Sequence, residues 1–320
     1  MRIIKLDEIN ATLKTIDLLP IIEEGFSAYS AGRAVIPPVG ELLFNDPPGD
    51  VHIKYGYIKS DPYYVIKIAS GFYHNAALGL PSSNGMMLLF SQRTGEAVGI
   101  LLDEGRLTDL RTAAAGAIAA RYLAPKNVLR IGILGAGIQA RQQLRFLKQV
   151  TDCRQAIVWG LTQEEVDAYK TEMQLEGFEI ETTLDPAALP HTCNLIVTVT
   201  PSRKPLLNAQ DIQPGTHITA VGADTPGKQE LETAIITAAD RLVVDSISQV
   251  IERGECQHAF QAGLILSTDM VELGAVIAGH APGRQNDDQV TIADLTGVAV
   301  QDIQITRAVY EAVTASKGEK

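Results

Sequence analysis

The sequence predicts an α/β fold of two domains, and three observations lead to it. Short apolar runs alternate with helical stretches between residues 129 and 263, which is typical of parallel βαβ units. Apolar and polar residues alternate with a period of two between residues 51 and 103, as in a mainly antiparallel sheet. Residues 135–140 (GAGIQA) form a G-x-G-x-x-A between an apolar run and a helical stretch, the glycine pattern of the Rossmann fold. We therefore expect a Rossmann domain and a second, mixed α+β domain.

Residues 1–118 and 300–320 are expected to form the mixed domain, which would bind the substrate and form a dimer. Its clearest amphipathic helix covers residues 16–29, and residues 300–316 are expected to return to it as a helix. Its strands are expected at residues 51–58, 63–69, 86–90 and 97–103.

Residues 119–299 are expected to form the Rossmann domain. Its strands are expected at residues 129–134, 156–159, 179–182, 195–200, 217–221 and 242–244. Its helices are expected near residues 139–150, 164–176, 230–238 and 247–263.

Each residue of the glycine motif has a physical task if the motif joins a strand to a helix. Gly135 permits a tight turn, Gly137 allows the backbone to approach a pyrophosphate, and Ala140 allows the helix to pack closely on the strand. The unpaired N–H groups at a helix N-terminus attract phosphate. The motif therefore predicts that this domain binds a dinucleotide, NAD or NADP.

Composition limits the partners of the protein. The formal net charge of −11, without a basic stripe, disfavours nucleic acid and anionic membranes. No apolar stretch approaches the roughly 20 residues that cross a bilayer, and the start of the chain lacks a signal-peptide core. The three scattered cysteines fit a reduced cytoplasm, and the histidines and cysteines show no metal-ligand spacing. We therefore expect a soluble cytoplasmic protein without a metal ion, nucleic acid or membrane partner.

Two basic residues that precede the Rossmann domain are candidates for binding an anion. Lys67 lies on the less apolar face of its expected strand, a pattern that a solvated sheet face explains equally well. The adjacent Gly71 and the loop at residues 75–84, rich in Gly, Ser, Pro and Asn, favour a binding site. If Thr108 is the N-cap, Arg111 is the third residue of its helix, where a cation opposes the helix dipole. A substrate carboxylate or a cofactor phosphate would resolve that conflict, and so would a salt bridge to Asp109 or another local acid.

Two segments that follow strands of the Rossmann domain could face a ligand, because ligands of open α/β sheets bind at the carboxyl ends of the strands. Residues 198–204 contain Ser and Thr side chains that could contact the cofactor or simply form a turn. Asp224 follows the strand at residues 217–221 and could exchange a proton near the nicotinamide, or only hold the Pro-Gly turn that follows it.

Six segments, taken in order along the chain, point to one family. They are Lys67, LTDLRTAA at 107–114, GAGIQA at 135–140, VGADTPGKQEL at 221–231, Gly283-Arg284 and TIADLTGVAVQD at 291–302. Together they resemble the ornithine cyclodeaminase/mu-crystallin family along nearly the whole chain. Members of this family are NAD(P)-binding homodimers and include ornithine cyclodeaminase, alanine dehydrogenase and reductases of α-imino acids, so the resemblance implies an NAD(P)-binding homodimer. Residues 54–121 resemble most a branch associated with ectoine utilisation and related imino-acid reductases.

The resemblance also implies a role for each candidate residue. Lys67 corresponds to the substrate-binding lysine and is a catalytic candidate, Arg111 to the arginine that holds the substrate carboxylate, and Asp224 to the general acid/base. The segments that contact the cofactor in the family correspond to Gly135, Gly137, Ile138, Gln139, Thr200, Val221 and Gly222, with Ser83 as a weaker match.

Two departures from the family pattern concern the substrate. The arginine that often follows the first prolines is absent near Val39 and Gly40. Lys54 lies 13 residues before Lys67, where ornithine cyclodeaminase has a glutamate suited to a distal ammonium group. A lysine would repel that ammonium group and attract a second carboxylate, so Lys54 is also a candidate for binding the substrate.

The end of the second Rossmann strand leaves the choice between NAD and NADP open. Leu161 and Thr162, both candidates for cofactor binding, occupy the place of the acidic residue that accepts the ribose hydroxyls of NAD. An arginine for the NADP phosphate is absent as well. Because no acid at this place would repel that phosphate, the sequence slightly favours NADP.

The combined prediction is an NAD(P)-dependent oxidoreductase that acts on the C–N bond of a small α-imino or α-amino acid, as a ketimine reductase or an amino-acid dehydrogenase. Ornithine cyclodeaminase, which forms proline with catalytic NAD, is the first alternative, and Lys54 argues against it. The second alternative is a crystallin-like protein that binds NADP or a small ligand without turnover. The presence of Lys67, Arg111 and Asp224 together argues against that alternative.

Overall fold

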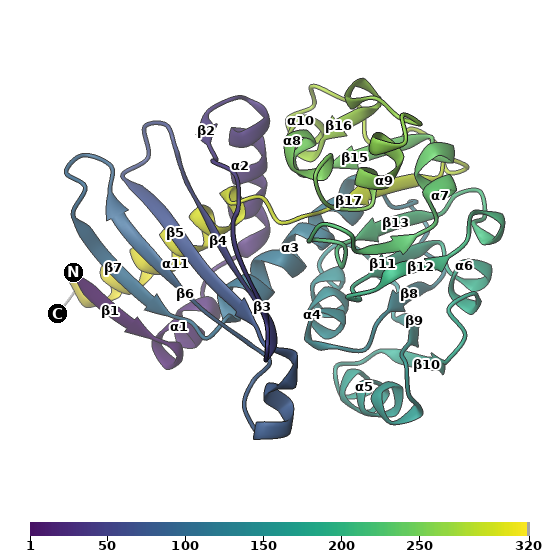
Figure 1. The fold of residues 1–320 in the computed structure, drawn as a ribbon, viewed down its shortest axis with the longest axis horizontal. Helices are drawn as coiled ribbons and strands as arrows, with labels where there is room; N and C mark the ends of the chain where they lie inside the picture. Colours follow the sequence, from purple (N-terminus) through teal and green to yellow (C-terminus); the bar gives the residue numbers. More distant parts are fainter. Residues whose placement is uncertain (319–320) are drawn as a thin grey trace. The chain divides into compact units, whose positions relative to one another are not determined.

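The computed structural model describes residues 1–318 and divides into two compact units. Unit 1 comprises Met1–Arg111 and Val298–Lys320, and unit 2 comprises Thr112–Gly297. The chain passes into unit 2 within helix α3 (Arg106–Leu123) and returns to unit 1 just before helix α11 (Val300–Gly318), as Figure 1 shows. The assignment of substrate to one unit and cofactor to the other stays a prediction.

Unit 1 is built on a seven-stranded sheet in the order β1-β7-β6-β5-β4-β2, with β3 paired to β4. Its strands are β1 (Arg2–Lys5), β2 (Ala34–Val35), β3 (Gly40–Asn45), β4 (Pro48–Ile58), β5 (Tyr63–Gly71), β6 (Ser83–Ser91) and β7 (Ala97–Leu102). Neighbouring strands are antiparallel except for β1 and β7. The period of two in the sequence therefore forms the antiparallel part of this sheet, and the parallel strand β1 extends one edge.

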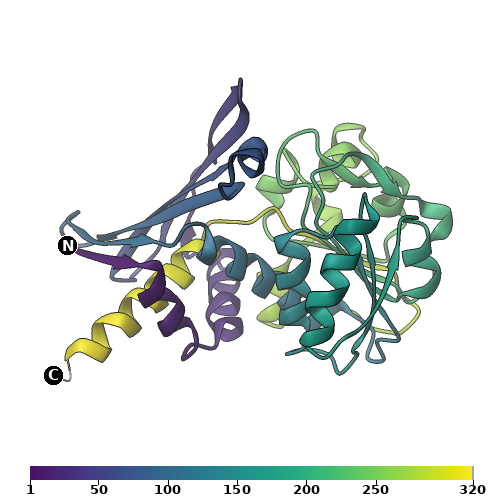
Figure 2. The same cartoon turned by 90° about the horizontal axis from the view of Figure 1, so that it is seen from below.

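Three helices of unit 1 cover one face of its sheet (Figures 1 and 2). They are α1 (Leu6–Leu13), α2 (Leu18–Ser30) and α11, while a short 3-10 helix, η1 (Tyr73–Leu78), follows β5. Helix α11 packs against β4, β5, β6 and β7. The buried residues Ile58, Val65, Leu89, Ala28 and Ile303 form a core between helices and sheet.

The other face of this sheet carries apolar side chains that are partly exposed. Tyr55 and Tyr57 of β4 each expose 37% of their surface, and Met86 of β6 exposes 36%. On the same face, the rings of Tyr64 and Phe90 stack with centroids 4.9 Å apart. Unit 1 therefore has one face covered by helices and one apolar, partly exposed face.

Unit 2 is a doubly wound sheet of eight parallel strands in the order β10-β9-β8-β11-β13-β17-β15-β16. Its strands are β8 (Ile131–Leu134), β9 (Gln155–Trp159), β10 (Glu179–Thr183), β11 (Leu195–Thr198), β13 (His217–Ala220), β15 (Arg241–Val244), β16 (Met270–Glu272) and β17 (Thr291–Asp294). The strand order reverses between β8 and β11, which is where such folds bind their ligands. The predicted α/β fold with a Rossmann domain is thus confirmed.

The remaining elements of unit 2 surround this sheet, with α4 and α6 on opposite sides of β8 (Figure 1). Its helices are α4 (Ile138–Leu147), α5 (Gln163–Leu175), α6 (Ala188–Thr192), α7 (Thr233–Ala238), α8 (Ile247–Val250), α9 (Cys256–Gln261) and α10 (Leu273–Ile277), with the 3-10 helices η2 (Ala209–Asp211) and η3 (Ser267–Asp269). A separate pair of parallel strands consists of β12 (Arg203–Leu207) and β14 (Gln229–Leu231). Within the described residues, no helix is long and apolar enough to span a membrane.

Two helices expected in unit 2 differ in the structure. The helix expected at 230–238 begins only at Thr233, because Gln229–Leu231 form the strand β14, which pairs with β12. The helix expected at 247–263 is divided into α8 and α9 at Gly254, whose φ is +90°. A Cβ on Gly254 would lie 2.6 Å from the Asp294 carboxylate, so the close approach of the backbone to this buried acid interrupts the helix.

Candidate active site

A buried cluster of charged side chains lies on the helix-covered face of the sheet in unit 1. Lys67 of β5 and Arg111 of α3 share one carboxylate, that of Asp302 in the first turn of α11. Lys67 Nζ lies 3.3 Å from Asp302 Oδ2, and Arg111 Nε lies 2.9 Å from Asp302 Oδ1. Arg111 Nη1 also donates a hydrogen bond of 3.0 Å to Gln301 Oε1. The structure therefore brings together two of the predicted substrate-binding residues.

Lys54 joins this cluster through the register of the sheet. It lies directly opposite Lys67 in the pairing of β4 with β5 and is only 6% exposed. Burial lowers the pKa of Lys67 to about 7, the attraction of Asp302 opposes that shift, and the positive charges of Arg111 and Lys54 add to it. A ligand carboxylate would be attracted to these three cations.

The position of Arg111 in its helix differs from the expectation. Helix α3 begins two residues before Thr108, and the side chain that caps it is Asp103, whose Oδ2 accepts a 2.8 Å hydrogen bond from Leu107 N. Arg111 therefore lies in the second turn, where the helix dipole acts on it less strongly. Its acidic partner is Asp302, from the far end of the chain, rather than a local acid.

The glycine motif forms the turn between β8 and α4 in unit 2. Gly135 has a φ of +118°, which favours glycine, and its N–H donates to Trp159 O at 3.0 Å. Gly137 is the N-cap of α4 and has no side chain that could cap the helix. The side chain of Arg141 donates hydrogen bonds to the carbonyl oxygens of Ala136 and Gly137 and so stabilises the turn.

This turn has the properties that a pyrophosphate requires. Apart from the adjacent residues of the chain, no described heavy atom lies within 4 Å of an ideal Cβ built on Gly137, so the space beside the helix N-terminus is open. Ile138, which is 51% exposed, and Gln139 form the first turn of α4, whose N–H groups point toward that space. The residues present therefore fit a dinucleotide at this turn.

The neighbouring strand ends bring Thr200, Val221 and Gly222 close to one another. Val221 N and Gly222 N both donate to Thr198 O, at 2.9 and 3.2 Å. A Cβ on Gly222 would lie 2.2 Å from Thr200 O, so only glycine allows these two segments to approach each other. Together with the glycine turn, these candidates line the carboxyl ends of β8, β11 and β13.

Glu230 connects these strand ends, and the sequence reasoning did not find it. Its carboxylate accepts hydrogen bonds from Thr198 Oγ1 at 2.7 Å, Thr200 N at 2.6 Å and Gly222 N at 3.0 Å. Burial raises its pKa to about 7, although the three donors oppose that shift. No local pattern could have revealed this role, because Thr198 and Thr200 lie 32 and 30 residues away in the sequence.

Asp224 lies beyond the end of β13 and has a partner that the sequence reasoning also missed. Lys228 Nζ donates to Asp224 Oδ1 at 2.7 Å, and Thr225 Oγ1 donates to the same oxygen at 3.1 Å. The side chain of Asp224 is 47% exposed, so it is accessible to a substrate. The spacing of four residues, Asp224 to Lys228, was the available signal for this ion pair.

The other three cofactor candidates lie in different places. Leu161, 76% exposed, follows the end of β9, and Thr162 is the N-cap of α5, accepting a 3.3 Å hydrogen bond from Glu165 N. Ser83 is the first residue of β6 and pairs with Gly71 in unit 1. Leu161 and Thr162 thus belong to the same strand-end edge as the glycine turn, whereas Ser83 belongs to the other unit.

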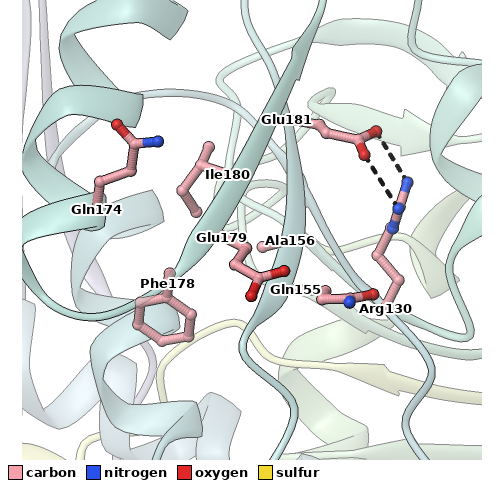
Figure 3. Close-up of a pocket in the computed structure, with 8 residues that line it drawn as sticks. All are labelled: Arg130, Gln155, Ala156, Gln174, Phe178, Glu179, Ile180 and Glu181. Carbon is pink, nitrogen blue, oxygen red and sulfur yellow. Dashed lines mark hydrogen bonds and ion pairs between the residues drawn. The ribbon is translucent and has the colours of Figure 1, made fainter.

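A pocket of about 430 Å³ in unit 2 lies away from this edge. It is lined by Arg130, Gln155, Ala156, Gln174, Phe178, Glu179, Ile180 and Glu181 (Figure 3). The strand residues among them begin β9 and β10, so the pocket lies at the amino ends of these strands. The Arg130–Glu181 ion pair at 2.9 Å closes one side of it. None of the predicted site residues lines this pocket.

Comparison with known proteins gives a consistent result. A sequence model of the ornithine cyclodeaminase/mu-crystallin family matches residues 2–317. An uncharacterized cyclodeaminase of Sinorhizobium fredii is 42% identical over 299 residues, which cover 92% of this chain and 90% of that relative.

Solved structures resemble the chain over nearly its whole length. An archaeal alanine dehydrogenase dimer with bound NAD has 34% identity and a TM-score of 0.89, with 98% of this chain and 96% of that chain covered. The iminosuccinate reductase of Paracoccus denitrificans in complex with NAD⁺ has 32% identity and a TM-score of 0.87, with 98% and 97% covered. The Δ1-pyrroline-2-carboxylate reductase of Thermococcus litoralis with NADH and L-proline has 26% identity and a TM-score of 0.91, with 99% and 98% covered.

Proposed function

Because the chain belongs to the ornithine cyclodeaminase/mu-crystallin family, we propose that it is an NAD(P)-dependent oxidoreductase acting on the C–N bond of a small α-imino or α-amino acid. The family and this type of function both agree with the predictions from the sequence. The observation that carries the proposal is the pair of buried cations, Lys67 and Arg111, held by the single carboxylate of Asp302.

The substrate carboxylate binds to Lys67 and Arg111 in this proposal. A guanidinium group has five N–H donors, and the contacts of Arg111 with Asp302 and Gln301 involve only Nε and Nη1. A carboxylate beside Lys67 stabilises the ammonium form of a group whose pKa burial has lowered to about 7. A pKa near neutrality also allows Lys67 to exchange a proton during turnover, which makes it the second catalytic candidate.

Proton transfer at the substrate nitrogen is assigned to Asp224. When bound at the glycine turn, NAD(P)H supplies the hydride. Gly135 and Gly137 give the turn its shape, and Thr200, Val221 and Gly222 hold the adjacent strand ends. Asp224, accessible and oriented by Lys228, gives a proton to the nitrogen during imine reduction and accepts it during amine oxidation.

The direct test is to follow the oxidation of NADH and NADPH with a panel of cyclic imines and of keto acids supplied with ammonia. We expect turnover with at least one small α-imino acid, and loss of that turnover in Arg111→Met with cofactor binding unchanged. A protein that binds the dinucleotide but turns over no member of the panel would instead support the crystallin-like alternative.

Lys54 favours a second carboxylate on the substrate. It lies opposite Lys67 on the same buried face, and a distal ammonium group there would meet three cations. The iminosuccinate reductase, whose substrate has two carboxylates, is one of the similar proteins. Imines of dicarboxylic acids are therefore expected to have a higher kcat/KM than their monocarboxylic analogues, and Lys54→Met is expected to remove that preference. Equal kcat/KM values in the wild type would contradict this assignment.

The cyclodeaminase alternative has its own test. A cyclodeaminase oxidises and re-reduces its substrate with the same NAD, so ornithine and a trace of NAD should then give proline and ammonia. We expect neither product, because Lys54 and Lys67 would repel the distal ammonium group of ornithine.

We propose further that the protein is a cytoplasmic homodimer formed through the apolar, partly exposed sheet face of unit 1. The similar archaeal alanine dehydrogenase is a dimer. Tyr55, Tyr57 and Met86 would be buried by such contact. Light scattering is expected to give the mass of a dimer for the wild type and of a monomer for Tyr57→Lys. Leu175→Lys, a change at a residue of unit 2 that is 87% exposed, should leave the dimer intact.

A further inference from the structure

The first turn of helix α5 places an acidic side chain beside the end of β9. Glu165 Oε2 accepts a 3.2 Å hydrogen bond from Leu161 N, so the carboxylate is held against the segment that follows Trp159. Thr162 caps the same helix through Glu165 N at 3.3 Å. The strand end itself carries no acid, but the turn of helix that follows it does.

The same carboxylate lies close to the glycine turn. The ends of β8 and β9 are paired in parallel register, and Gly135 N donates to Trp159 O at 3.0 Å. A Cβ on Gly160 would lie 3.3 Å from the Cβ of Ala136 and 3.6 Å from Glu165 Oε2. Gly160 therefore separates the turn from the carboxylate without filling the space between them.

We propose that Glu165 selects NAD(H) over NADP(H) by accepting hydrogen bonds from the adenosine ribose hydroxyls. The inference rests on the proposed function, because it needs a dinucleotide at the glycine turn. In dinucleotide-binding folds the acid that binds the ribose lies at the end of the second strand, which is the position of Glu165 in space. A carboxylate has two oxygens that together accept about four hydrogen bonds, so its contact with Leu161 N leaves capacity for two hydroxyls. A 2′-phosphate at the same place would meet a like charge.

A purely structural role for Glu165 is the competing explanation. A Thr at the N-cap followed three residues later by Glu is the sequence of a capping box, which stabilises a helix start without any ligand. Glu165→Gln separates the two roles, because glutamine keeps an oxygen that can accept from Leu161 N but has no negative charge. Glu164→Gln is the matched control, since it removes the same charge from the adjacent exposed residue in the same turn.

The test measures the dissociation constants of NADH and NADPH for the whole protein and the two variants. The chain has a single tryptophan, Trp159, which lies at the end of β9, so energy transfer to the bound reduced nicotinamide reports binding without turnover. We expect the wild type to prefer NADH and Glu165→Gln to shift the ratio of the two constants toward NADPH by about tenfold, the scale of a hydrogen bond to a charged group. Glu164→Gln should shift that ratio by less than about twofold, because an exposed charge that does not contact the ligand is screened by solvent.

Two results would overturn the inference. One is a wild type that prefers NADPH, and the other is a Glu165→Gln variant with an unchanged ratio and a lower urea midpoint, which would show a capping role alone. Failure of all three proteins to bind either dinucleotide would contradict the proposed function itself. A second variant, Leu161→Arg combined with Glu165→Gln, supplies a cation for the 2′-phosphate at an exposed position and should prefer NADPH outright.

Discussion

The charged cluster of unit 1 and the strand-end edge of unit 2 would bind their proposed ligands with different parts of the chain. In unit 1 the groups are side chains, Lys67 and Arg111, which are buried and share the single carboxylate of Asp302. In unit 2 they are mainly backbone N–H groups and glycines that leave space, at Gly135 and Gly137. A buried charged side chain is stable only while its oppositely charged partner is present. A phosphate site made of backbone N–H groups instead requires that the backbone can approach the ligand closely. The two regions should therefore fail in different ways when they are altered.

The largest effect is expected from removing the shared carboxylate of unit 1. Asp302→Asn leaves Lys67 and Arg111 buried without their counter-charge and should lower the free energy of unfolding by about 3–5 kcal/mol, measured by urea denaturation. Glu181→Gln breaks the solvent-exposed pair with Arg130 and should cost at most about 1 kcal/mol. Equal, small effects of the two changes would mean that burial does not distinguish the cluster from a surface ion pair.

A loss of turnover without a loss of binding is expected at Asp224. Asp224→Asn removes the proton-transfer group and should lower kcat by about a hundredfold, while the dissociation constant of NADH stays unchanged. Asp288→Asn makes the same chemical change at an exposed residue that precedes β17 and should leave kcat unchanged. Near-normal turnover of Asp224→Asn would remove this residue from the mechanism.

Two glycines at the edge of unit 2 should respond differently to the same substitution. The added methyl of Gly222→Ala would collide with Thr200 O and the Glu230 carboxylate, so unfolding should become easier by about 1–3 kcal/mol. Gly137→Ala adds its methyl without a collision and should lower the free energy of unfolding by at most about 1 kcal/mol, because alanine is a poorer N-cap than glycine. It should nevertheless weaken NADH binding, because the methyl occupies the space for the pyrophosphate. Unchanged binding in Gly137→Ala would place the dinucleotide elsewhere.

A difference in pH dependence between the two regions is expected as well. Burial raises the pKa of Glu230 from 4.5 to about 7 in the folded protein, so the native state holds this proton more tightly than the unfolded chain does. The contribution of Glu230 to the free energy of unfolding is therefore fully present below pH 4.5 and is lost as the pH rises through about 7. Burial lowers the pKa of Lys67 from 10.5 to about 7, which has the opposite sign, and stability rises with pH across that range.

Urea midpoints between pH 5 and pH 10 test this difference. Glu230→Gln should flatten the fall of stability below pH 7, and Lys67→Met should flatten the rise above it. A pH profile that neither substitution changes would show that these two groups do not set the dependence of stability on pH in this range.

Local features of the sequence determined much of this protein. The period of two in β4 and β5 and the strand–turn–helix around Gly135 depend on residues that are neighbours along the chain, so their patterns can be recognised without the fold. The family and the type of reaction followed from motifs of the same local kind. For Lys67, Arg111 and Asp224 the residues could be named, but their roles remain proposals.

Only the tertiary structure decided which groups face these residues. Asp302 reaches Lys67 and Arg111 because α11 returns to the sheet of unit 1 from the other end of the chain. Glu230 joins strand ends about 30 residues away, and the first turn of α5 brings Glu165 beside the end of β9. A sequence pattern records which backbone conformation a residue favours, whereas the partner of a buried charge is set by the packing of distant elements against each other.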